Sequence, residues 1–311
     1  MKVLITGGLG QIGSHVAEML LERGDEVLVI DNLATGRVEH LSPAAGLTVV
    51  IGSIADRELI ETQFSLFQPD AVLHAAASYK DPEDWYEDSL TNCVGGANIV
   101  NAAKNHGSPR FVYLQTSLCY GLNPVESPIS LTHPLNPQGS SYAISKTANE
   151  LYLHLSGLDF VTFRLANVIG PRNLAGPLPI FYSRLKQGKG CFVSSTRRDF
   201  VFVKDLAIHI VKALDGRGSG TYHFSSGEDV PISELYFEVA RAMGLEPAPK
   251  PEIIPAGPDD VSSILLDPSR TATDFGEFAS TALAQIVDEA VVYYEEHGTR
   301  GEVTHLKIEK S

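Results

Sequence analysis

The first thirteen residues, MKVLITGGLGQIG, constrain the fold of this chain more than any other segment. They include the apolar run from Val3 to Ile5, which is typical of a buried parallel strand. Three spaced glycines, Gly7, Gly10 and Gly13, then lead into the helical pattern SHVAEMLLERG. Where such a turn opens a helix, backbone N–H groups and the positive helix end stabilise an anion. The segment predicts a strand, a tight turn and a helix around a pyrophosphate site, although glycines also mark ordinary turns.

An acidic residue farther along the chain favours a dinucleotide as the ligand. Asp31 ends the apolar run EVLVI, 18 residues after Gly13. An acid about 20 residues after such a glycine turn accepts hydrogen bonds from the hydroxyls of an adenosine ribose. The same carboxylate would repel a 2'-phosphate, so the sequence predicts NAD rather than NADP. Arg37 is the only basic residue near this position that weakens the prediction.

Apolar runs recur at 2–6, 26–31, 47–51, 71–74, 110–115 and 160–165, and helical patterns separate most of them. This alternation predicts a doubly wound parallel sheet of the α/β class with helices on both faces. Later helical patterns lie near 206–214, 232–243 and 282–296. We expect a nucleotide-binding domain over 1–170 and a smaller substrate-binding lobe over 171–311, with some later segments returning to the first domain.

Composition excludes several classes of protein. A formal net charge of -14 and a pI near 5.1 argue against a nucleic-acid surface. The three cysteines are an odd number without metal-ligand spacing, so we expect reduced thiols and no metal. No apolar run approaches the roughly 20 residues of a membrane span, and the N-terminus passes directly into the first strand without a signal peptide. A cytoplasmic protein is expected.

Ligands of doubly wound sheets bind at the carboxyl ends of the strands, and several candidates lie there. The turn at Ser53 and Ile54 could flank an adenine, or be an ordinary strand-to-helix turn. The fourth strand ends in HAAASYK, whose small alanines suit a flat cofactor lying against backbone. We interpret His74 as a packed, hydrogen-bonded side chain rather than a catalytic one.

Two glycines interrupt a long helical pattern that runs from about Pro82 to Ala103. Each glycine costs roughly 1 kcal/mol relative to alanine within a helix. Gly95 and Gly96 therefore indicate the close approach of another backbone.

The chemical signal lies between residues 110 and 156. An apolar run ends at Thr116, and a helix then begins with Ser140 or Ser141 as N-cap. Tyr142 and Lys146 are four residues apart and share one face of that helix. A lysine ammonium and a positive nicotinamide ring would both stabilise a tyrosine phenolate. Tyr142 could then exchange a proton with a substrate hydroxyl while Lys146 holds a ribose, which is alcohol–ketone chemistry. A YxxxK pair alone is common on solvated helices.

The chain resembles the extended short-chain dehydrogenase/reductases, specifically the NAD-dependent nucleotide-sugar epimerases and dehydratases with a Rossmann fold. The resemblance covers nearly the whole length and rests on TGGLGQIG, DNL, HAAA, TSLCYG, YAISK, RLANVIGPR and RRDFVFVKDLA in that order. It implies that Thr116, Tyr142 and Lys146 form a catalytic trio. It also implies that Leu165 lies near the nicotinamide. Asn167 and Arg198 would face the diphosphate of the substrate.

Motifs and resemblance together define two expected sets of binding residues. Those expected to contact NAD are Gly7, Gly10, Gln11, Ile12, Gly13, Asp31, Asn32, Leu33, Gly36, Ser53, Ile54, Ala75, Ala76, Ala77, Asn92, Tyr142, Lys146 and Leu165. Those expected to contact the nucleotide sugar are Ser78, Tyr79, Lys80, Ser117, Asn167, Phe192 and Arg198. Phe192 could stack on a base, although an aromatic in an apolar run is more often part of the core. Arg198 suits a phosphate because a guanidinium is a bidentate donor.

Departures from the family pattern narrow the expected reaction. Dehydratases of the family have Asp and Glu after the catalytic hydroxyl, where this chain has Ser117 and Leu118. Without an acid there, epimerisation is favoured over dehydration. Gly257 replaces an arginine that similar epimerases use on the diphosphate, and Ser53 replaces an Asp beside the adenine.

These observations lead to a UDP-sugar 4-epimerase with a transient 4-keto intermediate, acting in carbohydrate or polysaccharide biosynthesis. Similar enzymes are commonly homodimers built through two helices of the sheet domain, and we expect the same here. An NAD-dependent dehydrogenase or ketoreductase, a dehydratase, and a non-catalytic NAD-binding sensor remain as alternatives.

Overall fold

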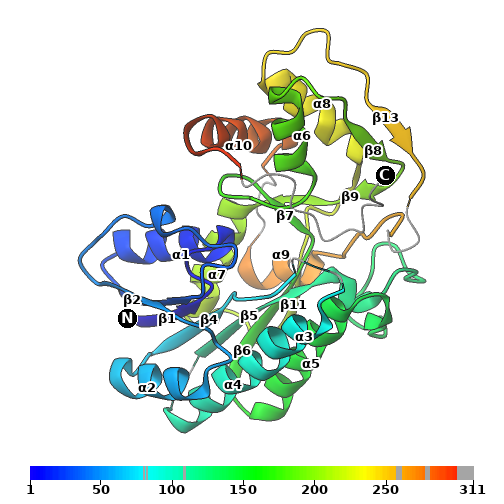
Figure 1. Cartoon of the computed structure of the whole chain (residues 1–311). Coiled ribbons are helices and arrows are strands. Elements are labelled where there is room, and N and C mark those ends of the chain that lie inside the picture. Colours follow the sequence, from blue (N-terminus) through cyan, green and yellow to red (C-terminus); the bar gives the residue numbers. More distant parts are fainter. Residues whose placement is uncertain (80, 82, 108–109, 257–260, 277–280, 300–311) are drawn as a thin grey trace.

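A parallel sheet of seven strands organises the computed structural model, which describes residues 1–79, 81, 83–107, 110–256, 261–276 and 281–299. The strands lie in the order β3-β2-β1-β4-β5-β6-β11 (Figure 1). Their bounds are β1 Lys2–Thr6, β2 Glu26–Asp31, β3 Leu47–Ile51, β4 Ala71–His74, β5 Arg110–Thr116, β6 Asp159–Leu165 and β11 Gly220–Phe224. The order reverses between β1 and β4, as in a doubly wound sheet. The predicted fold class is confirmed, and the six runs expected as strands are all strands of this sheet.

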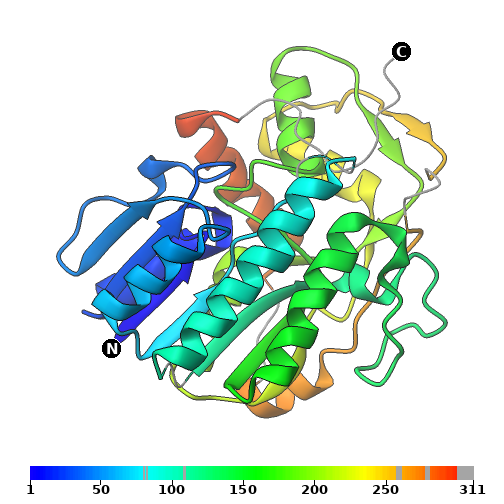
Figure 2. The same ribbon diagram turned by 60° about the horizontal axis from the view of Figure 1, so that its bottom comes forward.

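Helices cover both faces of the sheet. The helices α1 (Gln11–Glu22) and α7 (Val203–Leu214) pack together on one face. The other face carries α2 (Arg57–Phe67), α4 (Gly96–Asn105) and α5 (Ser141–Ser156), and Figure 2 shows α4 and α5 side by side. The late strand β11 and helix α7 therefore belong to the sheet layers although both follow residue 170 in the chain.

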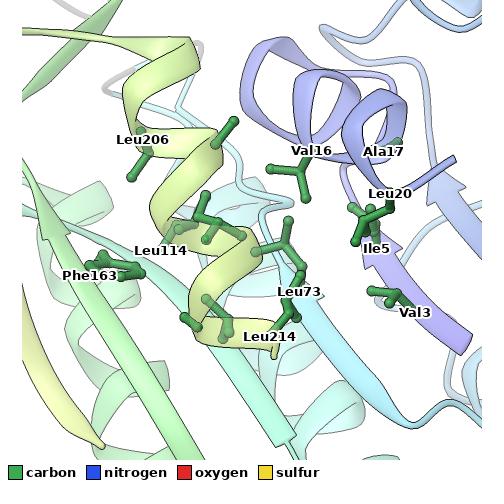
Figure 3. Close-up of a cluster of buried hydrophobic side chains, with 14 of the residues drawn as sticks. Val3, Ile5, Val16, Ala17, Leu20, Leu73, Leu114, Phe163, Leu206 and Leu214 are labelled. Carbon is green, nitrogen blue, oxygen red and sulfur yellow. The ribbon is translucent and has the colours of Figure 1, made fainter. Parts of the chain in front are cut away.

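Alternating side chains of β1 supply the cores on the two faces. Val3 and Ile5 join a buried cluster with Val16 of α1 and Leu206 of α7 (Figure 3). Leu4 points the other way, into the cluster formed with α2, α4 and α5. Fully burying one such side chain stabilises the fold by about 1.5–3 kcal/mol, so the paired cores hold the strand ends in place.

The remaining elements form a smaller lobe beyond the carboxyl ends of the strands (Figure 1). Its helices α6 (Pro177–Lys186), α8 (Ile232–Ala242) and α10 (Leu283–His297) enclose a third buried cluster. Short strand pairs complete the lobe: β7 (Asn167–Ile169) with β10 (Phe200–Phe202), β8 (Phe192–Ser194) with β13 (Glu252–Ile254), and β9 (Arg197–Arg198) with β12 (Val230–Pro231). Helix α9 (Ser269–Phe275) packs on β11. Three short 3-10 turns are η1 (Val38–His40), η3 (Ser117–Tyr120) and η4 (Pro137–Gly139).

The long helix expected from about Pro82 begins later and is not uniform. It starts at α3 (Trp85–Asp88), continues as a π-helical segment η2 (Ser89–Gly95), and becomes α4. Asp84 caps its start, because its Oδ1 accepts a hydrogen bond from the N–H of Glu87 at 3.0 Å. Pro82 itself lies outside the described residues.

Another segment approaches each of the two glycines in this helix, mainly through side chains. A Cβ at Gly95 would lie 2.5 Å from Cγ1 of Ile54 and 3.4 Å from its backbone carbonyl carbon, and one at Gly96 would lie 2.3 Å from Cγ of Asn149. The backbone approach expected from the sequence is therefore present at Gly95, whereas the nearest atoms at Gly96 all belong to a side chain. Asn149 belongs to α5, so Gly96 lets α4 and α5 pack closely.

Candidate active site

The glycine turn between β1 and α1 adopts the tight conformation expected from the sequence. Gly7 has φ +69°, and a Cβ there would lie 2.7 Å from the amide nitrogen of Ala76. A Cβ at Gly13 would lie 2.4 Å from the carbonyl oxygen of Gly7. Gly10 is the N-cap of α1 and has no side chain to accept from the N–H groups of the first turn. These N–H groups, which include those of Gln11 and Ile12, suit a phosphate.

Asp31 lies directly beside this turn, at the carboxyl end of β2. Its Oδ2 accepts a hydrogen bond from the N–H of Leu9 at 2.9 Å, and its Oδ1 accepts from that of Leu33 at 2.8 Å. A Cβ at Gly36 would lie 2.8 Å from Oδ1, so the loop after β2 folds closely over the carboxylate. In that loop, Asn32 accepts a hydrogen bond from the N–H of Ala34 at 3.0 Å. The structure thus brings the predicted acid to the mouth of the glycine turn.

The end of β4 lies against the same turn. The N–H of Ala75 donates to the carbonyl of Thr6 at 3.1 Å, and that of Ala76 donates to Thr6 Oγ1 at 3.3 Å. His74 is buried, and its Nδ1 lies 2.7 Å from the same hydroxyl. Burial lowers the pKa of His74 to about 3, so this histidine is neutral. The interpretation of His74 as a packed side chain is confirmed. Ala77 continues this strand end toward the loop of Ser78 and Tyr79.

Tyr142 and Lys146 occupy the first two turns of α5, whose N-cap is Ser140. The ammonium nitrogen of Lys146 lies 4.3 Å from the centroid of the Tyr113 ring and is buried. Burial lowers the pKa of Lys146 to about 7, and the charge of Glu150 offsets only part of this. Burial also raises the pKa of Tyr142, and Tyr79 adds to the increase. Burial therefore opposes the acidification of Tyr142 that the sequence predicts.

Thr116 ends β5 at the same edge of the sheet. Its Oγ1 accepts a hydrogen bond from the N–H of Leu118 at 3.2 Å and so caps η3. In the sheet register Thr116 pairs with Leu165, the last residue of β6. Helix α5 packs on both β5 and η3, so Thr116, Ser117 and the first turns of α5 belong to one region.

Tyr79 lies beside Tyr142. The centroids of the two rings are 6.3 Å apart, and burial raises the pKa of Tyr79. The N–H of Ser78 donates to Asn92 Oδ1 at 2.9 Å. Lys80, also predicted to contact the substrate, lies outside the described residues.

Three residues predicted to contact NAD have structural partners of their own. Asn92 donates from Nδ2 to the carbonyl of Ser78 and to the Oγ of Ser145, each at 3.0 Å, and is buried. Ile54 is buried against Gly95. The neighbouring Ser53 accepts a hydrogen bond from the N–H of Ala55 at 3.2 Å, as in an ordinary strand-to-helix turn.

The residues expected at the diphosphate and the base belong to the smaller lobe. Asn167 in β7 donates from Nδ2 to the carbonyl of Asp199 at 3.2 Å, and Arg198 donates to the carbonyl of Val261 at 2.6 Å. Phe192 is 39% exposed, so it is not a core residue. Gly257 lies outside the described residues.

A family model described as the NAD dependent epimerase/dehydratase family matches residues 3–224. The chain belongs to this family. It is 63% identical to the Bordetella bronchiseptica enzyme WbmH, solved in complex with NAD+, with a TM-score of 0.94 over 96% of this chain and 99% of that one. Bordetella bronchiseptica WbmG, solved with NAD and UDP, is 44% identical, with a TM-score of 0.89 over 98% of this chain and 97% of that one.

Curated relatives of this family member include two kinds of enzyme. The UDP-glucose 4-epimerase of Mycolicibacterium smegmatis is 31% identical over 94% of this chain and 98% of its own. The dTDP-glucose 4,6-dehydratase of an Actinoplanes strain is 30% identical over 94% of this chain and 98% of its own. The prediction of an NAD-dependent epimerase of the extended short-chain dehydrogenase/reductase type is confirmed, and NAD is its cofactor. The comparisons support nucleotide-sugar epimerisation as the general activity.

Two buried carboxyls of this epimerase were not predicted from the sequence. Asp88 ends α3 and is 2% exposed, and burial raises the pKa of its carboxyl. Glu150 follows Lys146 by one helical turn and forms an ion pair with Arg164 at 3.0 Å. Their four-residue spacings from Asn92 and Lys146 could have identified both, because residues four apart share a helix face.

A separate cavity of about 700 Å³ lies elsewhere in the epimerase, between α1, α10 and the loop after β2. Its lining includes His15, His40, Arg172 and Tyr293, and none of the predicted site residues. Among the described residues, no group of His, Cys, Asp and Glu side chains is arranged to hold a metal ion. Over the same part of the chain, no helix is both long enough and apolar enough to cross a bilayer.

Proposed function

We propose that this chain is an NAD-dependent UDP-sugar 4-epimerase that acts through a transient 4-keto sugar. The observation that carries the proposal is the convergence of four features at one sheet edge: the glycine turn, Asp31, Thr116 and the Tyr142–Lys146 pair. This arrangement combines a dinucleotide site with a proton-transfer group. It suits reversible oxidation of a secondary alcohol.

The residues at this edge fit NAD. The turn at Gly7 and Gly13 has no room for a Cβ, and a pyrophosphate would face the N–H groups that follow Gly10. Asp31 would accept hydrogen bonds from the adenosine ribose, and Ala75 to Ala77 would lie beside the ring system. NAD, when bound, supplies the acceptor and donor of one hydride.

The chain's own residues would move the proton. Tyr142 would take it from the 4-hydroxyl of the sugar and later return it to the 4-oxygen of the ketone, after the 4-keto sugar has turned so that its opposite face would receive the hydride. Lys146 would hold the nicotinamide ribose and, as an ammonium, stabilise the phenolate. The hydroxyl of Thr116 would donate to the reacting oxygen. Since the hydride and the proton both return, no net oxidation occurs.

Two observations favour a UDP-sugar and epimerisation over the dehydratase alternative. WbmG, which is 44% identical, was solved with UDP as well as NAD. Ser117 and Leu118 stand where dehydratases of the family carry acids, so no carboxyl there would act on C5 and C6. Asn167 and Arg198 are proposed to face the diphosphate, with residues 171–311 supplying most of the substrate lobe. We place the reaction in cytoplasmic carbohydrate or polysaccharide biosynthesis.

We further propose a homodimer formed through α4 and α5. On α5, Ile144, Leu151 and Leu155 are 51%, 51% and 82% exposed, and they recur at helical spacing. Trp85 and Val94, which precede α4, are also exposed. Exposed apolar side chains that recur at helical spacing are typical of a protein–protein interface.

The experiment is to incubate the purified protein with UDP-hexoses, UDP-hexosamines and UDP-hexuronates without added cofactor. We expect a C4 isomer of at least one of them and no accumulation of NADH. Stoichiometric NADH would identify a dehydrogenase instead. Absence of any C4 isomer, together with full cellular function of Tyr142→Phe, would favour the sensor alternative.

A further inference from the structure

Helix α5 is attached to the sheet by a carboxylate that lies one helical turn after Lys146. Glu150 is fully buried, and it accepts hydrogen bonds from Nε and Nη2 of Arg164 at 3.2 Å and 3.0 Å. It also accepts from Nε2 of Gln115 at 3.0 Å and from Oγ1 of Thr221 at 3.3 Å. These three partners belong to β6, β5 and β11, which are neighbours in the sheet (Figure 1). One residue of the helix is therefore bonded to three strands.

Gln115 connects this carboxylate to the end of β5. Its Oε1 accepts a hydrogen bond from the N–H of Thr116 at 2.8 Å, while its Nε2 donates to Glu150. An N–H group only donates and a carboxylate only accepts, so the amide of Gln115 fits in one orientation. The backbone of Thr116 is thus joined to α5 through two hydrogen bonds.

Arg164 continues the hydrogen bonds in the other direction. Its Nη1 donates to the hydroxyl oxygen of Tyr120 at 2.6 Å, and this hydroxyl lies 2.6 Å from Nε2 of His223. Nδ1 of His223 lies 3.0 Å from the carbonyl oxygen of Asp267, so Nδ1 carries the ring proton and Nε2 accepts from Tyr120. Burial lowers the pKa of His223 to about 4, which keeps the ring neutral. We call Gln115, Tyr120, Glu150, Arg164 and His223 the Glu150 network.

The network is attached to the face of α5 that carries the proposed chemistry. Tyr142, Lys146 and Glu150 follow one another at intervals of four residues, so they share one side of the helix. A rotation of α5 about its axis, or a shift along it, would break the hydrogen bonds of Glu150. The same movement would displace Tyr142 and Lys146.

The strand partners of Glu150 stand immediately before residues expected at the site. Gln115 precedes Thr116, and Arg164 precedes Leu165. In the register of the sheet, Gln115 pairs with Arg164, and Thr116 pairs with Leu165. Glu150 therefore binds the pair of strand residues directly next to the pair at the site.

The geometry of these bonds is more informative than their strength. A buried ion pair often adds little net stability, because the loss of hydration offsets much of the attraction. The guanidinium of Arg164 and the amide of Gln115 are planar groups with fixed donor directions. Both can bond to Glu150 only when α5, β5 and β6 keep one relative position.

We propose that Glu150 is a positioning residue of the epimerase: through its strand partners it holds the face of α5 that carries Tyr142 and Lys146 in place against the ends of β5 and β6. This inference rests on the proposed function of that pair. It gives a role to a carboxylate that none of the motifs quoted above contains.

The first test replaces the carboxylate by an amide. Glu150→Gln exchanges one oxygen for an NH2 group, which cannot accept a hydrogen bond from Arg164 or Gln115. We expect kcat to fall by about 10–100-fold, since a misplacement of about 1 Å can cost that much. The KM for the UDP-sugar should stay near the parent value, because the proposed diphosphate contacts lie in the smaller lobe.

An exchange of the two side chains should restore activity. Gln115→Glu combined with Glu150→Gln again places one carboxylate beside one amide, so each donor regains an acceptor. We expect this double variant to recover most of the kcat that Glu150→Gln loses. A double variant no more active than Glu150→Gln would overturn the inference.

A further variant separates position from charge. The charge of Glu150 favours the ammonium of Lys146, so Glu150→Gln changes both. Gln115→Met keeps this charge and the ion pair of Glu150, and removes only the bond that leads to Thr116. We expect kcat to fall about tenfold. If Glu150→Gln does not fold, Gln115→Met carries the test, and an unchanged kcat in it would overturn the inference.

Asp159→Asn is the matched control. Asp159 forms an ion pair with Arg110 at 2.8 Å, at the opposite ends of the same two strands. Its loss should leave kcat unchanged. An equal loss of kcat in Asp159→Asn and Glu150→Gln, or an unchanged kcat in Glu150→Gln, would overturn the inference.

Amide hydrogen exchange, measured by mass spectrometry on the purified protein, does not depend on turnover. In Glu150→Gln we expect faster exchange in peptides that cover 110–120 and 141–156, and parent rates in peptides from α10. This result without a C4 isomer from any UDP-sugar would support the network while the proposed function fails. Epimerisation by the parent protein with unchanged exchange in Glu150→Gln would overturn the inference alone. Faster exchange throughout the variant would show a general loss of stability and would overturn it too.

Discussion

At the scale of single residues, the pair Tyr142 and Lys146 carries the proposed chemistry, and its environment favours the uncharged form of both. Burial raises the pKa of the phenol and lowers that of the amine to about 7. A phenolate therefore requires nearby positive charge, which an ammonium at Lys146 and an oxidised nicotinamide would provide. The two residues work as a pair because an ammonium at Lys146 stabilises a phenolate at Tyr142, and the phenolate in turn stabilises the ammonium.

Replacing Tyr142 by Phe removes the proton-transfer group and keeps the ring. We expect epimerase kcat to fall by about 10²–10⁴-fold, while the NAD content of the purified protein stays at the parent level. Chromatographic assay of the sugar nucleotides, with NAD released by denaturation and quantified, checks both. A kcat close to that of the parent protein would rule out Tyr142 as the base.

Gly13→Ala tests the glycine turn. The new Cβ would lie 2.4 Å from the carbonyl oxygen of Gly7, so the turn must open and distort the phosphate site. We expect purified Gly13→Ala to contain much less NAD than the parent protein. Gly190→Ala is the matched control, since a Cβ there meets no atom within 4 Å. Equal NAD content in the two variants would contradict this account of the turn.

At the scale of elements, close packing of α4 on α5 determines where the active pair lies. Gly96 contacts Asn149, and Asn92 is bonded to Ser145 one turn before it. The predicted N-cap at Ser140 explains where α5 starts. Its axial position depends on these contacts with a helix more than forty residues earlier in the chain.

Gly96→Ala should lower the free energy of unfolding by about 1–3 kcal/mol, because overpacking against Asn149 exceeds the gain in helix propensity. Gly96→Ala combined with Asn149→Ala should recover part of this loss, since the second change makes room. Urea unfolding of both single variants and the double variant measures the coupling. Strictly additive effects would show that the two positions do not pack against each other.

At the scale of the whole molecule, several histidines on separate elements of the fold are buried as neutral groups. Burial lowers the pKa of His15 and His74 to about 3, and that of His40 and His223 to about 4. In the unfolded chain each would titrate near 6.5. The unfolded state therefore binds more protons than the native state as the pH falls below 6.5, and the native state loses stability there.

We expect the free energy of unfolding to decrease from pH 7 to pH 5, with each of these histidines contributing about 2 kcal/mol at pH 5. Urea unfolding at the two pH values measures the change. His223→Asn should show a smaller decrease than the parent protein, and the exposed His297→Asn should show the same one. An equal pH dependence in His223→Asn and the parent would contradict the prediction.

The proposed dimer also belongs to this scale. Leu155→Glu places a charge on the most exposed apolar residue of α5 and should give a monomer in light scattering. Ile253→Glu is the control, since Ile253 is 70% exposed on β13, which belongs to the smaller lobe rather than to α4 or α5. A Leu155→Glu variant that keeps the parent mass, or a parent protein that is already monomeric, would contradict the proposal.

Local patterns in the sequence determined the strand–turn–helix at the N-terminus, the six predicted strands, and the placement of Asp31, Thr116, Tyr142 and Lys146 at strand or helix ends. These features depend on residues close together in the chain, where periodicity and capping act. Only the tertiary structure decided the seventh strand, the side chains that Gly95 and Gly96 meet, and the buried carboxyls of Asp88 and Glu150. Each of these depends on which distant segments pack together. The burial of a side chain and the charge around it depend on all the groups that pack against it. Most of these groups come from distant parts of the chain, so no short stretch of sequence contains them.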